Sequence, residues 1–192
     1  MREESAEVGK KSPGNAMDKK VHSKRGIIQQ QALVLIKPDG MIKGLAGYVI
    51  AELSDTGLKM VGAKVVTVTK ELAEEHYQHL REKAFFKELI HYIMGSLHEK
   101  NILALVYQGE NCVEQIRNAI GATNPESAHP TSIRGKFGRI TTKGVFENVV
   151  HASENDREAE REIKLWFRPD ELAEAIYPTQ TRTVQKKEFF WK

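Results

Sequence analysis

The apolar run Ala32-Leu33-Val34-Leu35-Ile36 constrains the fold more than any other stretch of this chain. Apolar residues at consecutive positions, without polar alternation, are typical of a strand that is buried on both faces. The motif Lys37-Pro38-Asp39-Gly40 follows at once, and its proline lacks a backbone donor and disfavours helix at the residue before it. The strand is therefore expected to end at Ile36, with Lys37 held at its end beside a tight turn.

Hydrophobic periodicity places the remaining elements along the chain. Apolar spacings predict helices at 45–53, 70–80, 85–94, 112–120 and 154–166, and short apolar runs predict strands at 58–68, 102–107 and 146–150. With the first strand, the order β-α-β-α-α-β-α-β-α contains the β-α-β-β-α-β ferredoxin-like plan, with a helical pair inserted between the second and third strands. The expected fold is α+β, a four-stranded antiparallel sheet with helices over one face.

Charge and composition set the two ends of the chain apart. The formal net charge of the 192 residues is +3, but residues 1–27 and 182–192 contribute +3 each, so the chain between them carries −3. This distribution argues against a basic nucleic-acid-binding face. We expect residues 1–27 to be a disordered basic N-terminal tail, 28–177 to be a single domain, and 178–192 to be a C-terminal arm.

The cellular compartment is indicated by cysteine usage and by hydropathy. Cys112 is the only cysteine, so no disulfide can form within the chain, which fits a reducing compartment. No apolar run approaches the roughly 18 residues that indicate a membrane span. Residues 1–27 also lack the apolar core of a secretory signal. A cytoplasmic location without membrane attachment is expected.

His151 stands at a predicted junction between a strand and a helix. Phe146, Val149 and Val150 indicate a strand that ends before the histidine, and Ser153 can then cap the helix that follows. Unpaired backbone N–H groups at a helix start favour anions, so the position suits a histidine that meets a phosphate. Taken alone, this window favours the simpler interpretation, a polar residue at the exit of a strand.

Six motifs that are ordinary singly occur in a fixed order along the chain. They are Lys37-Pro38-Asp39-Gly40, His76-Tyr77, Phe85-Phe86, Gly121-Ala122-Thr123-Asn124-Pro125, Ile133-Arg134-Gly135 and Asn148-Val149-Val150-His151-Ala152-Ser153. In this order they closely resemble the nucleoside diphosphate kinase family, from about Gln31 to Leu172. The resemblance implies an enzyme that transfers the γ-phosphoryl group of a nucleoside triphosphate, typically ATP, to a nucleoside diphosphate. It also implies a ping-pong mechanism through a phosphohistidine.

The resemblance further implies roles for individual residues. His151 would carry the phosphoryl group as a pros-phosphohistidine, oriented by Ser153 and Glu162, and Lys37, held by Tyr77, would contact the ribose and the transferred group. The other nucleotide contacts would be Phe85 stacked on the base, Leu89 and Val145 beside it, Arg117, Thr123 and Arg134 on the phosphates, and Asn148 on the ribose 3′-hydroxyl. These residue types suit phosphoryl transfer, which depends on positioning and on charge stabilisation.

A cofactor and partners are implied in the same way. Magnesium would arrive on the nucleotide phosphates, without ligands from protein side chains, because the chain offers no dedicated carboxylate cage. A homo-oligomer is expected, a hexamer rather than a tetramer, with a subunit contact through the aromatics of the arm, Phe189, Phe190 and Trp191. No specific nucleic acid is expected. Fold alone also allows a nucleic-acid-binding module, or a homologue with a scaffolding or regulatory role.

Some positions depart from the family pattern. Ala84 stands where proline is common, Ala152 where glycine is common, and Glu154 where aspartate is usual. Loops at 95–101 and 138–144 look longer than in compact members, and the second leads into the expected base contacts.

The histidines other than His151 are assigned no function. His76 and His79 lie three residues apart on a predicted helix, a spacing that can hold a metal ion, but no third ligand is indicated. A surface position is therefore expected for both.

Overall fold

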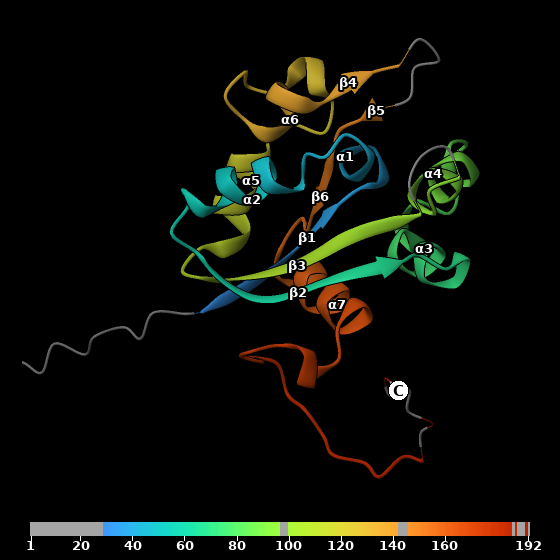
Figure 1. Cartoon of the computed structure of the whole chain (residues 1–192), viewed down its shortest axis with the longest axis vertical. Coiled ribbons are helices and arrows are strands. Elements are labelled where there is room, and N and C mark those ends of the chain that lie inside the picture. Colours follow the sequence, from blue (N-terminus) through green and yellow to red (C-terminus); the bar gives the residue numbers. More distant parts are fainter. Residues whose placement is uncertain (1–28, 97–99, 142–145, 186, 188–190, 192) are drawn as a thin grey trace, which may run out of the picture.

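The computed structural model describes residues 29–96, 100–141, 146–185, 187 and 191 (Figure 1). The predicted tail at 1–27, the side chains of Val145, Phe189 and Phe190, and parts of the two longer loops lie outside the described residues. Within the described part of the chain, no helix is long and apolar enough to cross a membrane.

An antiparallel sheet of four strands lies at the centre of the molecule (Figure 1). The strands are β1 (Gln30–Ile36), β2 (Lys59–Thr67), β3 (Asn101–Gly109) and β6 (Val150–Ala152), in the spatial order β2-β3-β1-β6. Each neighbouring pair is antiparallel. The predicted α+β, ferredoxin-like sheet is confirmed, and its first strand is a central one.

The helices follow the predicted order. They are α1 (Pro38–Ile42), α2 (Ala46–Ser54), α3 (Lys70–His76), α4 (Phe86–Ile93), α5 (Cys112–Ile120), α6 (Ile133–Phe137) and α7 (Asp156–Trp166), with 3₁₀ turns η1 (Gln78–Leu80), η2 (Pro125–Ser127) and η3 (Pro169–Glu171). The predicted helix at 70–80 is divided into α3 and η1, which together with α4 form the inserted helical pair. Helix α1 occupies the place where a tight turn was predicted, because a proline is well tolerated in the first turn of a helix.

Helices pack on both faces of the sheet, so the prediction of helices over one face was wrong. Successive residues of a strand point to opposite faces. The even-numbered residues of the run 32–36 join a core cluster with residues of α2 and α5, and the odd-numbered ones join a second cluster with residues of α3, α4 and α7. Figure 1 shows α2 and α5 on one side of the sheet and α7 on the other. The apolar run at 32–36 had predicted a strand that is buried on both faces, and the structure confirms this prediction.

The segment around His151 differs most from its prediction. The expected strand at 146–150 is two strands: β5 (Phe146–Glu147) pairs with β4 (Arg139–Ile140) in a small separate sheet, and β6 belongs to the main sheet. Between them the backbone turns at Val149, whose φ is +66°. His151 therefore lies within β6, opposite Leu35, and not beyond a strand end. The β-branched run concealed the turn, since valine rarely adopts a positive φ.

The helix cap that was assigned to Ser153 belongs to Asn155. The Asn155 side chain accepts a hydrogen bond from Glu158 N at 3.0 Å and begins α7. Ser153 is fully buried, and its Oγ accepts a hydrogen bond from Leu33 N at 3.1 Å. The serine therefore ties β6 to β1 instead of starting the helix.

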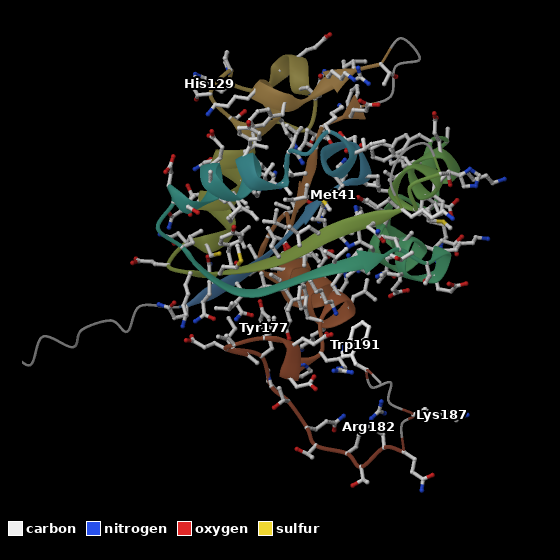
Figure 2. The ribbon with its side chains drawn as sticks, in the orientation of Figure 1. Met41, His129, Tyr177, Arg182, Lys187 and Trp191 are labelled. Carbon is white, nitrogen blue, oxygen red and sulfur yellow. The ribbon has the colours of Figure 1, made fainter. Side chains whose placement is uncertain are left out.

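Residues 178–185 run as an irregular arm away from the sheet (Figure 2). Tyr177 itself packs beside α7, with Lys164 Nζ 5.6 Å from the centre of its ring. The described residues of the arm, Trp191 included, are exposed. The arm boundary and its packing on a neighbouring subunit stay predictions.

Candidate active site

Side chains that could bind a ligand or react with it gather where the end of β1 meets β6. Ile36 pairs with Val150 and Leu35 pairs with His151, so Lys37 and His151 lie near the same end of β1. Residues directly opposite each other on antiparallel strands point to the same face. Leu35 belongs to the core cluster that includes α7, and His151 therefore faces that helix.

His151 is held through one ring nitrogen. Its Nε2 lies 3.0 Å from Glu162 Oε1, and the second carboxylate oxygen accepts a hydrogen bond from Ser153 Oγ at 2.6 Å. With an ionised Glu162, Nε2 carries the hydrogen and the lone pair is on Nδ1. Among the described residues, no hydrogen bond is made to Nδ1. The lone pair on Nδ1 is therefore available for bonding.

Glu162 is a buried carboxylate whose charge is retained. Burial alone would raise its pKa, but the adjacent His151 and the hydrogen bonds from His151 and Ser153 lower the pKa below its usual value. A carboxylate that accepts bonds on both oxygens fixes the ring orientation and tautomer of its histidine partner. The predicted orienting pair of Ser153 and Glu162 has this geometry.

Lys37 is buried beside Asn148. Its Nζ donates a hydrogen bond to Asn148 Oδ1, and the amide nitrogen of that side chain donates to Thr123 O at 2.7 Å. Burial lowers the pKa of Lys37 to about 8; the charge of Asp39 opposes this effect and that of Arg134 adds to it. The ammonium group is therefore available for an anion in neutral solution.

The predicted support of Lys37 by Tyr77 is not found among the described residues. Lys37 Nζ lies 5.2 Å from the ring centre of Tyr92 instead. The Tyr77 ring lies 6.1 Å from that of His151, and burial raises the pKa of its phenol. Tyr77 thus forms part of the wall beside the histidine.

Arg134 and Arg117 differ in burial and in the hydrogen bonds that they already make. Arg134 is buried, and its terminal nitrogens donate to Gly121 O and Val150 O, each at 2.9 Å. Burial, with a contribution from the charge of Arg117, lowers the pKa of Arg134 to about 10. Arg117 is an exposed residue of α5. The Arg134 guanidinium is therefore fixed next to the strand of the histidine, whereas that of Arg117 is open to solvent.

The residues expected at the base lie on the outside. Phe85 precedes α4 and is 53% exposed, and Leu89 follows on that helix and is partly buried. Thr123 is also exposed, although its carbonyl is used by Asn148. The third expected base contact, Val145, lies outside the described residues.

The prediction that His76 lies at the surface was wrong. It is fully buried at the end of α3, with its ring edge-on to that of His151 at 4.5 Å. Its Nδ1 accepts a hydrogen bond from Trp166 Nε1 at 3.1 Å, and burial lowers its pKa well below the usual range. His76 is therefore a neutral wall of the site. Ala73, three residues earlier and buried on the same helical face, was the sequence signal for this position.

Comparison with known sequences decides the family. A sequence model described as nucleoside diphosphate kinase matches residues 30–172. The chain belongs to the nucleoside diphosphate kinase family. It is 43% identical over 158 residues to a nucleoside diphosphate kinase of Pyrococcus horikoshii, which covers 82% of this chain and 96% of that protein. It is also 44% identical over 144 residues to that of Pyrococcus abyssi, over 75% of this chain and 87% of the relative.

Solved structures of nucleoside diphosphate kinases share the fold. The enzyme from Borrelia burgdorferi, solved as a transition-state mimic with vanadate and ADP, superposes with a TM-score of 0.69 at 34% identity, over 78% of this chain and 93% of that one. The enzyme from Halobacterium salinarum in complex with CDP gives a TM-score of 0.69 at 36% identity, over 78% and 95%. The predicted activity, phosphoryl transfer between nucleoside tri- and diphosphates, is thereby confirmed.

One group of metal-ligating side chains occurs in the described part of this kinase. Ligand atoms of His76, His151 and Glu162 lie within 4.8 Å of one another. Trp166 donates a hydrogen bond to His76 Nδ1, and both His151 and Ser153 contact Glu162. These hydrogen bonds orient the His151 ring.

Proposed function

We propose that this nucleoside diphosphate kinase carries the phosphoryl group on Nδ1 of His151, as a pros-phosphohistidine, in a ping-pong reaction. The observation that supports it is the hydrogen bond between Nε2 and Glu162, which leaves the Nδ1 lone pair outward. The side chain of His151 is 18% exposed, enough for a phosphate to reach the ring edge.

The chemical step exchanges one bond to phosphorus for another. The Nδ1 lone pair attacks the γ-phosphorus of the triphosphate, and the bond to the β,γ-bridging oxygen breaks, so that the diphosphate leaves with that electron pair. The imidazole gains positive character, which the Glu162 carboxylate opposite Nε2 stabilises. An incoming diphosphate then reverses the step, and its terminal oxygen takes the phosphoryl group from nitrogen.

Cations and amides around His151 would place the nucleotide. Lys37 and the unused N–H groups of Arg134 would hold the transferred phosphate, with the exposed Arg117 and the Thr123 hydroxyl on the neighbouring phosphates. Asn148, joined to Lys37, would bind the ribose 3′-hydroxyl.

Base binding would depend on surface contacts. Phe85 would stack on the base, with Leu89 and Val145 beside it. Stacking on an aromatic face tolerates any base, which suits a kinase that acts on several nucleotides.

The cofactor, assembly and compartment are part of the same proposal. Magnesium would enter on the nucleotide phosphates, where it neutralises charge that the protein cations do not reach. The assembly would be a homo-oligomer, a hexamer rather than a tetramer. The single cysteine, buried in the core, supports a cytoplasmic location.

The alternative of a nucleic-acid-binding sheet is not supported by the geometry. Such modules stack bases on aromatic residues of an open sheet face. Here both faces of the sheet are covered, and Tyr107 of β3 is buried.

The proposal is tested by labelling the protein with γ-labelled ATP. The expected phosphoenzyme is stable to alkali and labile to acid, and its alkaline digest contains the Nδ1 isomer of phosphohistidine. His151→Ala should abolish the label, whereas His91→Ala, at an exposed histidine of α4, should keep it. Label that survives in His151→Ala, or an Nε2 isomer in the wild type, would contradict the assignment.

A further inference from the structure

The Lys37-Pro38-Asp39-Gly40 motif is hydrogen-bonded to the turn that precedes His151. Asp39 is fully buried, and its Oδ2 accepts a hydrogen bond from Val149 N at 3.0 Å. We infer that Asp39 is a positioning residue, which holds Val149 in a left-handed turn and thereby sets Asn148 and His151 relative to each other. The inference rests on the proposed role of His151.

The turn itself is strained. Val149 has a φ of +66°, and Val150 N donates to Asn148 O at 2.7 Å across it. This is a γ-turn of the positive-φ form, which is rare and strained. A β-branched residue in this region is an outlier that persists only where its surroundings enforce it.

The motif supplies that enforcement on both sides of Val149. Asp39 takes the N–H, and the backbone N–H of Lys37 donates to Val149 O at 2.8 Å. Gly40 lets the two segments approach, because a Cβ there would lie 3.0 Å from Val149 Cγ1 and 3.2 Å from Val149 O. Val149 thus joins the first motif, Lys37-Pro38-Asp39-Gly40, to the last, which contains His151.

The turn determines where the two functional side chains point. Residues three apart on a continuous strand face opposite sides of a sheet. Because the chain turns at Val149, Asn148 reaches Lys37 and Thr123 while His151 faces Glu162 on α7. Loss of the turn would separate the nucleophile from the groups that hold its substrate.

Asp39 also acts on Lys37, and the two roles predict different mutants. Its charge raises the pKa of Lys37, against the effects of burial and of Arg134. Asp39→Asn removes the charge but keeps an oxygen that can accept from Val149 N, whereas Asp39→Ala removes both. At pH 6.5 Lys37 is protonated in the wild type. A comparison of the two variants at this pH therefore reports mainly on the hydrogen bond between Asp39 and Val149 N.

The experiment measures the single-turnover rate of His151 phosphorylation from ATP at pH 6.5, in Asp39→Ala and Asp39→Asn. Each is made with Val149 and with Val149→Gly, since glycine adopts a positive φ without a steric penalty. Asp39→Ala should lower the rate about 10²-fold in the Val149 background, as small misplacements of reacting groups do. The loss should fall below about tenfold with Val149→Gly, and KM for ATP should change less than the rate.

Asp39→Asn alone should retain the rate within about tenfold. This measurement remains informative even if Asp39→Ala fails to fold. The inference is overturned if Asp39→Asn loses about 10²-fold or more, because charge would then be the dominant contribution. Equal losses from Asp39→Ala in the two backgrounds, with circular dichroism unchanged, would also overturn it. Labelling of the wild type on His151 tests the proposed function separately.

Discussion

The two ends of the proposed nucleotide site are built differently. At the phosphate end, Glu162, Ser153 and Asn148 are buried and joined by hydrogen bonds to one another or to the residues they orient. At the proposed base end, Phe85 is 53% exposed and directly precedes α4, and its ring has no polar atom that could join such a network. Groups held by several buried bonds keep one geometry, whereas an exposed ring can adjust to its ligand.

Because of this difference, the rate of phosphoryl transfer and the binding of the base should depend on different residues. Phosphoryl transfer needs the nucleophile fixed in line with the leaving oxygen, and misplacement there reduces the rate. Base binding without hydrogen-bond readout requires only a flat apolar surface. Mutations at the two ends should therefore affect different kinetic constants.

Glu162→Gln should have the largest effect and act on turnover. An amide can donate to Nε2 and favour the tautomer with hydrogen on Nδ1, where the lone pair is required. A misoriented catalytic histidine of this kind loses several powers of ten in rate, and we expect a loss of about 10³-fold in kcat. Stopped-flow measurement of phosphoenzyme formation, with KM for ATP measured in parallel, checks it.

The matched control is Glu160→Gln, on the same helix. Glu160 is partly exposed and pairs with Lys164 in the described part of the chain, so its substitution should leave the rate within about twofold. A rise in KM with an unchanged kcat in Glu162→Gln would mean that the carboxylate binds nucleotide and does not orient the histidine.

Deprotonation of Lys37 should lower kcat/KM at alkaline pH. Its pKa of about 8 means that the free enzyme carries this charge below pH 8 and loses it above. The charged and titratable groups around it are Asp39, Arg134 and His76, with the Tyr92 ring beneath. We expect kcat/KM to fall about tenfold per pH unit above this value, measured for ATP between pH 6 and 10.

Two variants sharpen that profile. Asp39→Asn should move the alkaline limb to lower pH, because the charge of Asp39 raises the pKa of Lys37. Lys37→Gln should be weakly active without this limb. If the limb persists in Lys37→Gln, another group causes it.

The sequence predicted the buried central strand and the helix at 112–120, because each had an uninterrupted pattern and a clear end signal, Pro38 and Gly121. Two residues of the ordered motifs, Tyr77 and Ser153, lie beside His151 or its partner Glu162. The prediction failed at Val149 and at His76, for separate reasons. A positive φ in valine is imposed by the distant Asp39, and the burial of His76 depends on packing against Trp166. Contacts between residues about 90 or more positions apart leave no local pattern.

Phe85→Ala should have the smallest effect and act on the base end. Removing a stacking ring typically costs about 1–3 kcal/mol per base, so we expect KM for ATP to rise roughly tenfold while kcat changes less than about threefold. Steady-state kinetics with purine and pyrimidine nucleotides check it, and Tyr48→Ala, at a ring that is 64% exposed on α2, is the control. Purines, with the larger π-face, should lose more than pyrimidines. A drop in kcat as large as that of Glu162→Gln would show instead that the base end also positions the phosphate, and the two ends would then form one coupled unit.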